Sequence, residues 1–453
     1  MCNDKTKFLS SSLKAKLNDM KKFLLLLVFV AGVQNAKAQI PGYISDTLQD
    51  ILDGYQGPSI PGISASAYIN GYGIWQGATG DSYLGTDLDT TMLMGIGSDT
   101  KLFTSVLVLK MVENGILTLD DELNQWLPSY PNIDSSITIR QCLQHQSGVF
   151  NYTNHPDFGT DVFADLSAVW PATDILNYVN APLFAPGADL IYCNTGYVLA
   201  GLVLESATGI PYETLVRDSI LTPLQMNSTF VGGLEPEQGV RAHPHDGSTN
   251  LFTLSRIALE SSAYSAGSIV SKPSDMVKWY HAVFNLSFIN AQSMAELTSW
   301  TSNPLMGLGL VQYQYSGKTY WGHGGAILGY RSMMVYDPDC GHSVSVLRNN
   351  LDYDPVTVAN DLIATLCDIT STIGLEEKEL SQVDIYPNPA MDAITIEIEE
   401  SILNSSYRIV DLQGKTVLLD ELDQLSNTVD IGELNNGLYH VQIGNLVYKI
   451  MKD

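Results

Sequence analysis

The pattern of hydrophobic and polar positions predicts strands at both ends of a long domain and helices in its middle. Hydrophobic residues alternate with polar or small ones over residues 63–75 around an Asn70-Gly71 dipeptide, which is typical of a β-hairpin. From Lys101 to about Pro223, hydrophobic residues recur at helical spacing between long loops. The first part of this domain is therefore a hairpin followed by a helical region.

Strand character returns towards the end of the same domain, in segments 307–313, 331–336 and 342–347. Early strands that pair with late strands around a helical middle give an α/β domain. We expect a mixed or antiparallel sheet flanked by helices, with an inserted helical lobe. A catalytic site would then lie in the cleft between the sheet and the lobe.

A different pattern follows a polar segment. Residues 371–380 are rich in charged side chains and predict a linker between two folded parts. Beyond it, residues 381–453 alternate between hydrophobic and polar, as at Ile394, Ile396 and Ile398, which predicts a small all-β sandwich. The chain is thus divided into a main domain at 39–370, a linker at 371–380 and a C-terminal β-domain.

The first 38 residues have the pattern of a secretory signal peptide. Lys21 and Lys22 precede an apolar run of 11 residues, 23–33, and the run is followed by Ala36-Lys37-Ala38. A membrane span needs roughly 20 apolar residues, and no stretch of this chain is that long. Cleavage after Ala38 would leave Gln39 as the mature N-terminus, with Met20 as an alternative start. A buried N-terminal helix fits these flanking residues less well.

Charge and cysteine content narrow the choice of partners. The chain has a formal net charge of −26, and removal of residues 1–38, which carry +5, leaves −31. Such an acidic protein is not suited to nucleic acid or to an anionic membrane surface. The cysteines show no CxxC pair and predict no disulfide framework, although one bridge between Cys340 and Cys367 stays open.

A candidate nucleophile lies at the start of the first long helix. Ser98 and Lys101 stand three residues apart in Ser98-Asp99-Thr100-Lys101, so both face the same side of the first helical turn. A serine hydroxyl needs an adjacent base, and a lysine serves as one when burial or positive charge lowers its pKa. The same spacing also fits an ordinary helix N-cap with an exposed lysine, so further partners are needed.

Two further segments supply candidate partners. Tyr192-Cys193-Asn194 lies in a loop before an apolar helix, where a tyrosine can relay a proton and an asparagine amide can hold Lys101 and a substrate carbonyl. Gly322-His323-Gly324-Gly325-Ala326 precedes a predicted strand, and its glycines permit close approach of a ligand to the backbone. Each segment alone is equally consistent with an ordinary loop or turn.

Together and in this order, the three segments resemble the serine β-lactamase-like family, which includes penicillin-binding carboxypeptidases, class C β-lactamases and related esterases and aminopeptidases. Segments 137–148, 184–187, 266–271 with Asp275, and 322–332 agree with the same family, and the resemblance spans about residues 45–366. It implies a β-lactamase/transpeptidase-like fold and an acyl-enzyme on Ser98. The chain has no P-loop and no GxGxxG after a predicted strand, so no cofactor is expected.

The resemblance implies a role for each site residue. Lys101 and Tyr192 would share the base and acid roles, and Asn194 would orient them. His323, Gly324, Gly325 and Ala326 would contact the substrate, and the backbone N–H groups of Ser98 and Ala326 would form the oxyanion hole. His323 stands where many members carry a lysine. Because a neutral histidine binds a carboxylate more weakly, specificity for β-lactams or peptide C-termini is put in doubt.

The C-terminal domain carries a second resemblance. Its segments 386–389, 411–415, 434–439 and 447–452 resemble, in order, the C-terminal sorting domain of type IX secretion cargo. A generic adhesive β-sandwich is the alternative. The resemblance implies that export and sorting machinery recognises residues 381–453. The protein would then be exported through the periplasm and secreted or held at the cell surface.

Three other histidines are candidates for metal binding or catalysis. His243 and His245 with Asp246 are plausible metal ligands, but the intervening proline and the lack of further ligands favour a loop without metal. His145, beside Ser147-Gly148, is more typical of a hydrogen-bonded turn residue than of a catalyst, and it is assigned no role.

The sequence therefore predicts a secreted serine hydrolase that cleaves an amide or ester bond in a small-molecule or peptide substrate. β-Lactamase and D-Ala-D-Ala carboxypeptidase activities are the first expectation, and a small-molecule esterase or D-aminopeptidase is the alternative. A binding protein of the penicillin-binding type that has lost turnover is the rival outside the enzymes. The natural substrate, the cleavage of the tail and the oligomeric state stay open.

Overall fold

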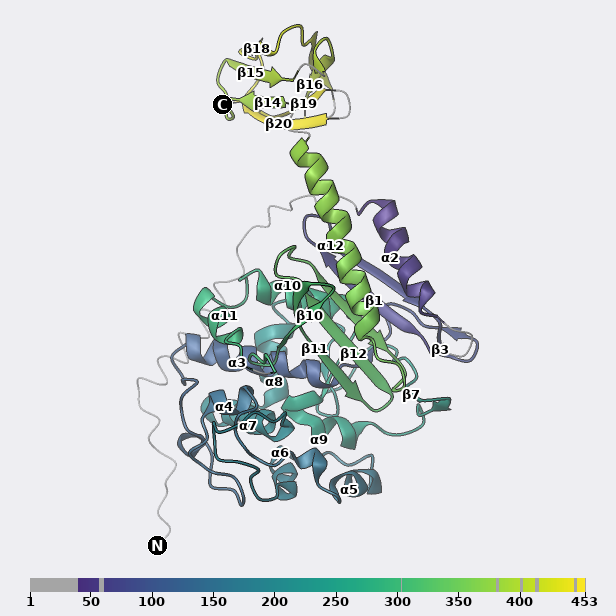
Figure 1. The fold of residues 1–453 in the computed structure, drawn as a ribbon, viewed down its shortest axis with the longest axis vertical. Helices are drawn as coiled ribbons and strands as arrows, with labels where there is room; N and C mark the ends of the chain where they lie inside the picture. The colour runs from purple at the N-terminus through teal and green to yellow at the C-terminus, as the bar shows by residue number, and fades with distance from the viewer. Residues whose placement is uncertain are drawn as a thin grey trace.

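The computed structural model describes residues 40–56, 61–302, 304–379, 383–399, 402–411, 415–443 and 446–452 (Figure 1). The predicted signal peptide at residues 1–38 lies outside the described residues. The centre of the main domain is a six-stranded sheet in the order β10-β11-β12-β13-β1-β2, in which every neighbouring pair is antiparallel. Its strands are β1 (Ile63–Ile69), β2 (Gly73–Thr79), β10 (Val311–Tyr315), β11 (Lys318–Ile327), β12 (Tyr330–Tyr336) and β13 (Ser343–Arg348).

The pairing of β1 with β13 closes the sheet from both ends of the domain, as the sequence predicts. The predicted fold class, an α/β domain with an antiparallel sheet and a helical lobe, is confirmed. The first hairpin turns at Asn70-Gly71, where Gly71 has a φ of 84° that suits a residue without a side chain.

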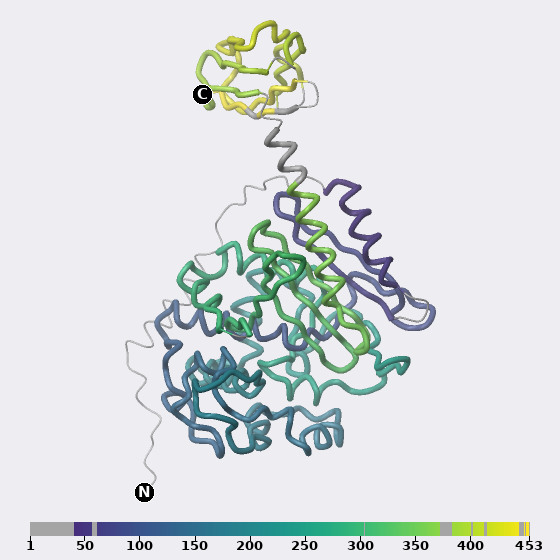
Figure 2. Tube along the Cα trace, viewed as in Figure 1, coloured from purple at the N-terminus to yellow at the C-terminus, as the bar shows by residue number. Residues whose placement is uncertain are grey.

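Helices cover both faces of the sheet. Helices α2 (Gly42–Gly54) and α12 (Val356–Glu379) pack on one face, and α10 (Pro273–Phe284) packs against β1 and β13 on the other (Figures 1 and 2). Ile44, Leu48 and Leu52 recur every four residues along α2 and are fully buried on the sheet side. This face of the sheet and its two helices form one hydrophobic core.

The helical lobe surrounds α3 (Thr100–Glu113). All ten residues from Thr100 to Leu109 are buried, and Lys101 is the one among them whose side chain is ordinarily charged. Its other helices are α4 (Ile139–Leu143), α5 (Phe158–Ala164), α6 (Ala172–Ile175), α7 (Asn194–Thr208), α8 (Tyr212–Val216), α9 (Ile257–Gly267) and α11 (Ala291–Leu297). The lobe also contains the short 3-10 turns η1 (Gly97–Asp99), η2 (Leu123–Gln125), η3 (Tyr152–Asn154) and η4 (Leu176–Tyr178), and a π-helical segment, η5 (Arg217–Leu221), that continues α8. A helix buried on all sides is a rigid base for residues at its N-terminus.

A small three-stranded sheet contains the strand that leads into α3. Strand β5 (Met94–Gly95) pairs with β9 (Ile269–Ser271), which pairs with β6 (Phe230–Val231). Because β5 runs directly into η1, this sheet sets the direction in which the chain enters α3. Two further pairs, β3 (Asp81–Tyr83) with β4 (Thr86–Asp87) and β7 (His245–Asp246) with β8 (Thr249–Asn250), lie outside the main sheet.

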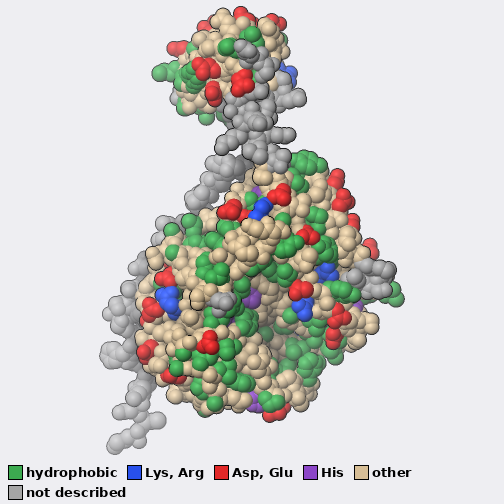
Figure 3. All heavy atoms as spheres, in the orientation of Figure 1, with side chains coloured by type: hydrophobic (Ala, Val, Ile, Leu, Met, Phe, Trp, Pro, Cys, Tyr) green, Lys and Arg blue, Asp and Glu red, His purple; other side chains and the backbone are tan. Residues whose placement is uncertain are grey.

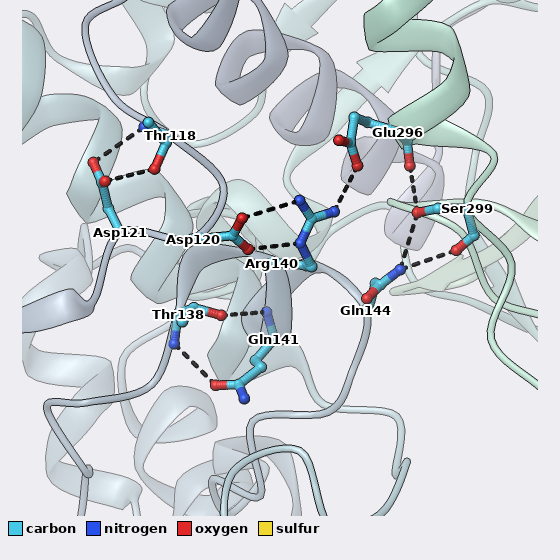
Figure 4. A network of polar contacts seen from close by, with 9 residues as sticks. All are labelled: Thr118, Asp120, Asp121, Thr138, Arg140, Gln141, Gln144, Glu296 and Ser299. Carbon is cyan, nitrogen blue, oxygen red and sulfur yellow. Dashed lines mark hydrogen bonds and ion pairs between the residues drawn. The ribbon is translucent and has the colours of Figure 1, made fainter.

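A polar network holds α4 in place (Figure 4). Thr138 and Gln141 form a reciprocal capping box at the N-terminus of α4. Arg140 binds Asp120 at 2.8 Å and Glu296 of α11 at 2.6 Å, and the Gln144 amide donates to the Ser299 carbonyl. These contacts fix the turn that follows α4 and carries His145.

The C-terminal domain consists of two antiparallel sheets. One has the order β14-β15-β18 and the other β17-β16-β19-β20, and side chains of both, such as Ile394, Ile396, Ile409 and Val441, share one core. The strands are β14 (Val383–Tyr386), β15 (Ala393–Ile398), β16 (Ser406–Val410), β17 (Thr416–Glu421), β18 (Ser426–Asp430), β19 (Gly437–Ile443) and β20 (Leu446–Lys452). The predicted all-β domain is thus present.

Helix α12 continues to Glu379, so most of the segment that the sequence marks as a linker is helical. Cys340, in the turn after β12, is disulfide-bonded to Cys367 of α12, whereas Cys142 and Cys193 are free and buried. Among the helices that the structure describes, none has the length and apolar character that crossing a bilayer requires.

Candidate active site

Ser98 lies in η1, on the short turn that joins β5 to α3. Gly97 before it has a φ of 51°, and a Cβ on Gly97 would lie 2.6 Å from the backbone nitrogen of Ala326. Only glycine fits such a close approach. The tight turn therefore brings Ser98 next to β11 and leaves its side chain partly exposed.

Lys101, in the first turn of α3, is the candidate base for Ser98. Its side chain is fully buried, and its Nζ lies 3.0 Å from Ser98 Oγ and 2.8 Å from the carbonyl oxygen of Ala266. Burial lowers the pKa of Lys101 to about 7, although Cys193 and Asp99 oppose this shift. At neutral pH a large fraction of this lysine is uncharged and able to accept a proton.

The Ala266 carbonyl reaches Lys101 because α9 is irregular near its end. Tyr264 has a φ of 42°, which interrupts the helical backbone two residues before Ala266. The sequence marks segment 266–271 by resemblance alone and gives no hint of this contact.

Tyr192 approaches Ser98 from the loop before α7. Its hydroxyl donates to Ser98 Oγ at 2.8 Å, and Lys101 Nζ lies 4.9 Å from the centre of its ring. Burial raises the pKa of Tyr192 well above its usual range, so the phenol keeps its proton at neutral pH. Ser98 Oγ therefore lies between a lysine that readily loses a proton and a tyrosine that holds one.

Asn194 does not take the place that the sequence suggests. Its backbone N–H donates to Asn151 Oδ1 at 3.1 Å, and its side-chain amide lies 3.4 Å from Thr153 Oγ1. The described hydrogen bonds of Asn194 thus run to η3 and the residue before it rather than to Lys101. The expected role of Asn194 towards a substrate carbonyl stays a prediction.

His323, Gly324, Gly325 and Ala326 lie on β11, which packs against η1. A Cβ on Gly325 would lie 1.9 Å from the carbonyl oxygen of Ile96, so glycine is required for β11 to pass this close to the nucleophile turn. The four residues therefore form one wall beside Ser98 and belong to a strand rather than a turn.

His323 is buried and uncharged. Its Nδ1 lies 2.6 Å from the carbonyl oxygen of Gly324, which accepts only, so Nδ1 carries the hydrogen and Nε2 has the free electron pair. Burial, with Lys101 nearby, lowers the pKa of His323 to about 4. This position therefore offers no positive charge near pH 7.

His145, to which the sequence analysis assigns no role, packs its ring against that of Tyr192. Its Nδ1 accepts the N–H of Cys193 at 3.1 Å, its carbonyl accepts the N–H of Ile191, and its ring centre lies 4.4 Å from that of Tyr192. Burial and Lys101 hold the pKa of His145 well below its usual range. The expectation of a hydrogen-bonded turn residue fits these contacts, and the turn supports the catalytic tyrosine candidate.

The face of the molecule in Figure 3 is hollowed near its centre, in the region of β11 in Figure 1, and β11 packs against η1. Hydrophobic side chains lie along part of its rim, basic and acidic side chains lie close to one side, and a histidine is visible within it (Figure 3).

His243 and His245 pack against neighbouring side chains and backbone in this fold. The His243 ring stacks between Tyr83 and Phe252, and His245 Nδ1 lies 3.2 Å from the carbonyl oxygen of Asn349. Within the described ranges, the one cluster with metal-ligand geometry is Asp337 with Cys340 and Cys367, and its two cysteines form the disulfide.

Comparisons with known proteins agree with the geometry. The sequence profile of the family described as Beta-lactamase matches residues 48–367, and that of the Secretion system C-terminal sorting domain matches residues 384–453. Penicillin-binding protein 4 of Amycolatopsis lactamdurans is 26% identical over 321 residues, which cover 64% of this chain and 81% of that protein. Penicillin-binding protein 4* of Bacillus subtilis is 33% identical over 159 residues, which span about a third of each chain.

Two solved structures share the fold of the main domain. The D-stereospecific amidohydrolase from Streptomyces sp. is 29% identical with a TM-score of 0.59, and the match covers 68% of this chain and 94% of that one. The D-amino acid amidase from Ochrobactrum anthropi SV3 is 26% identical with a TM-score of 0.63, over 72% of this chain and 99% of that one.

Proposed function

Because the chain belongs to the β-lactamase family, we propose that it is an exported serine hydrolase in which Ser98 forms an acyl-enzyme with an amide or ester substrate. One observation carries the proposal. Ser98 Oγ lies within hydrogen-bond distance of both Lys101 Nζ and the Tyr192 hydroxyl. A nucleophile between a base and an acid is the arrangement that acyl transfer needs.

In the first half of the reaction, neutral Lys101 accepts the Ser98 proton while Oγ attacks the substrate carbonyl. The Tyr192 hydroxyl then gives its proton to the leaving nitrogen or oxygen, the bond to the leaving group breaks, and Lys101 returns a proton to the tyrosine. The low pKa of Lys101 and the high pKa of Tyr192 suit these two roles. This assignment makes the lysine the base and the tyrosine the acid of acylation.

In the second half, the same pair hydrolyses the ester on Ser98. Neutral Lys101 accepts a proton from water, and the hydroxide adds to the acyl carbonyl. The bond to Ser98 Oγ then breaks as the Tyr192 hydroxyl gives its proton to Oγ, and Lys101 returns a proton to the tyrosine. Charge on the carbonyl oxygen would be stabilised by the backbone N–H groups of Ser98 and Ala326, because Gly97 and Gly325 allow β11 to approach the nucleophile turn. Loss of one such donor typically costs about 10²–10³-fold in rate.

The substrate preference follows from His323. A neutral side chain at this position does not hold a carboxylate by charge, so an uncharged amide or a small ester is favoured over a peptide with a free C-terminus. The amidase from Ochrobactrum anthropi has been solved in complex with D-phenylalanine and with L-phenylalanine amide. We therefore place amino acid amides, the D-aminopeptidase-like alternative of the sequence analysis, ahead of β-lactams and D-Ala-D-Ala peptides.

The C-terminal domain supports export. Its match to a secretion sorting domain indicates a secreted or cell-surface protein, and the signal-peptide pattern of residues 1–38 would provide entry to the periplasm. We propose the domain boundaries of the sequence analysis, with residues 39–370 as the hydrolase, 371–380 as the connection and 381–453 as the part that the sorting machinery recognises.

Two measurements test the proposal. Initial rates on D- and L-phenylalanine amide, p-nitrophenyl esters, a penicillin and a D-Ala-D-Ala peptide would rank the substrates. Labelling with a fluorescent phosphonate should be lost in Ser98→Ala and kept in Ser136→Ala, which removes an exposed hydroxyl of the lobe. Labelling without turnover of any substrate would favour the binding-protein rival, and equal labelling of both variants would refute the nucleophile.

A further inference from the structure

Asp99 follows the proposed nucleophile directly and is completely buried. Its Oδ2 lies 2.5 Å from the hydroxyl oxygen of Ser332 on β12. The same hydroxyl oxygen lies 2.7 Å from the carbonyl oxygen of Ile96, the residue before η1. Ser332 therefore joins both ends of the nucleophile turn to the main sheet.

The protons of this cluster can be counted. The Ser332 hydroxyl has one hydrogen but lies within hydrogen-bond distance of two oxygens, and the Ile96 carbonyl can only accept. If the Ser332 hydrogen goes to Ile96, the short contact with Asp99 is a hydrogen bond only when Asp99 Oδ2 carries a hydrogen. A protonated carboxyl satisfies both contacts, whereas a carboxylate leaves one of them as two electron pairs facing each other.

The surroundings also disfavour a charge on Asp99. Its Oδ1 is buried and has no hydrogen-bond partner among the described residues, and an unpaired charged oxygen in the interior is far more costly than an unpaired neutral one. Burial raises the pKa of Asp99 well above its usual range, against the opposing influence of Ser332 and Lys101.

The ionisable groups that act on Asp99 come from three elements. They are Lys101 of α3, Tyr192 of the loop before α7, and Tyr280 of α10. Burial raises the pKa of both tyrosines, so both are neutral near pH 7, and it lowers the pKa of Lys101 to about 7, so about half of this lysine is neutral there. The described groups that act on Asp99 therefore supply no fixed positive charge that would hold it as a carboxylate, and its partner on β12 is the hydroxyl of Ser332.

We propose that Asp99 is a positioning residue, kept protonated, that fastens the nucleophile turn to β12 through Ser332 and leaves Lys101 without a carboxylate partner. The inference rests on the proposed function, because it assigns Asp99 a part in setting the base. Ionised Asp99 would attract the proton of Lys101, raise the pKa of that lysine and remove the neutral base at neutral pH. A protonated Asp99 holds the turn without this effect.

The first test measures the protonation state without any turnover. A difference infrared spectrum of the full-length wild type minus Asp99→Asn, recorded near pH 7, should contain the carbonyl band of a protonated carboxyl. The same spectra on a Ser98→Ala background should agree, because the nucleophile is not needed for this state. A difference that contains carboxylate bands in place of the protonated band would overturn the proposal.

The second test uses the pH dependence of kcat/KM for the best substrate. Removal of a carboxylate beside Lys101 would lower the apparent pKa of the acid limb by about one unit or more, whereas replacement of a neutral acid by an amide should shift it by less than about 0.3 unit. We expect the smaller shift in Asp99→Asn. A shift of about one unit downward would show that Asp99 is ionised in the wild type.

The fastening role is tested by variants that differ in hydrogen bonding. Asp99→Leu and Ser332→Ala should each lower kcat/KM by roughly tenfold, the effect of one lost buried hydrogen bond, and their double variant should be no worse than either. Asp99→Asn should recover most of the loss seen in Asp99→Leu, since its amide donates to Ser332. Equal losses in Asn and Leu variants would overturn the role.

If the wild type is not labelled at Ser98, the proposed function fails, while the infrared result still decides the state of Asp99.

Discussion

Burial sets the acid-base behaviour of Lys101, and so the chemistry of the site begins with a single side chain. An exposed lysine is almost fully charged at neutral pH and is a poor base, whereas this one has a pKa of about 7 because its side chain is fully buried. Ser98 and the Ala266 carbonyl take its hydrogen bonds. The side chain is therefore both oriented and poised to accept a proton.

The pH dependence of activity follows from this pKa. Only the neutral form of Lys101 accepts the Ser98 proton, so kcat/KM should rise as pH increases through about 7. Lys101→Arg should lose activity by at least about 10³-fold across this range, because a guanidinium does not deprotonate. Rate measurements from pH 5 to 9 on wild type and variant check this prediction. A wild-type profile that is flat between pH 5 and 9 would contradict it.

His323 gives a second prediction for a single residue. His323→Lys introduces a positive charge where the wild type has a neutral ring, so the ratio of kcat/KM for a D-Ala-D-Ala peptide with a free carboxylate to that for D-phenylalanine amide should rise by roughly tenfold. His323→Gln, which stays neutral, is the control and should leave the ratio near its wild-type value. An equal change in both variants would show that charge at this position does not set the preference.

At the scale of elements, the site depends on the contact between η1 and β11. Gly325 faces the Ile96 carbonyl so closely that an added Cβ would lie 1.9 Å from that oxygen, whereas at Gly324 the nearest atom would be 3.4 Å away. Neighbouring glycines of one strand thus differ in the space available to them. The strand can move away from the nucleophile turn only by moving the Ala326 N–H as well.

The two glycines form a matched pair of variants. Gly325→Ala should lower kcat by about 10²-fold or more, as for the loss of an oxyanion donor, because β11 must shift away from η1. Gly324→Ala should lower kcat much less than Gly325→Ala, because an added Cβ at Gly324 meets no atom closer than 3.4 Å. Steady-state kinetics with circular dichroism as a check on folding would measure both. Similar losses in the two variants would contradict the account of the strand contact.

Some residues of the site could be predicted from the sequence, and others could not. The sequence grouped Ser98, Lys101 and Tyr192 through the family resemblance, because the spacing of the first two also fits a helix N-cap and the tyrosine segment also fits an ordinary loop. The structure places Lys101 Nζ and the Tyr192 hydroxyl within hydrogen-bond distance of Ser98 Oγ. The direction of the Asn194 amide, the carbonyl of Ala266 and the ring of His145 were not foreseen, because each depends on a long-range contact or on irregular backbone such as that at Tyr264. Periodicity contains no information about such contacts.

At the scale of the whole molecule, the active-site contacts lie within the main domain. The residues that surround Ser98 belong to η1, α3, β11 and the loop before α7, and α12 is the last element of that domain. A hydrophobic core of its own stabilises the C-terminal domain. Catalysis and sorting are therefore expected to be separable.

A truncation tests this separation. A chain that ends at Glu379 keeps α12 and lacks the C-terminal domain, and it should retain kcat/KM within about twofold because no site contact is removed. Export of the truncated chain should fail. Kinetics on the purified form and localisation in cells measure the two effects. A loss of more than about tenfold in kcat/KM with an intact fold would show that the domains cooperate in catalysis.

The central claim is that Ser98 carries the acyl group. Peptide mapping by mass spectrometry, after reaction of the full-length protein with a phosphonate probe or a slowly hydrolysed substrate, locates the adduct directly. The account predicts one adduct, on the peptide that contains Ser98, which forms much more slowly in Lys101→Arg. An adduct on another residue, or an adduct at Ser98 that forms at the wild-type rate without the lysine, would contradict it.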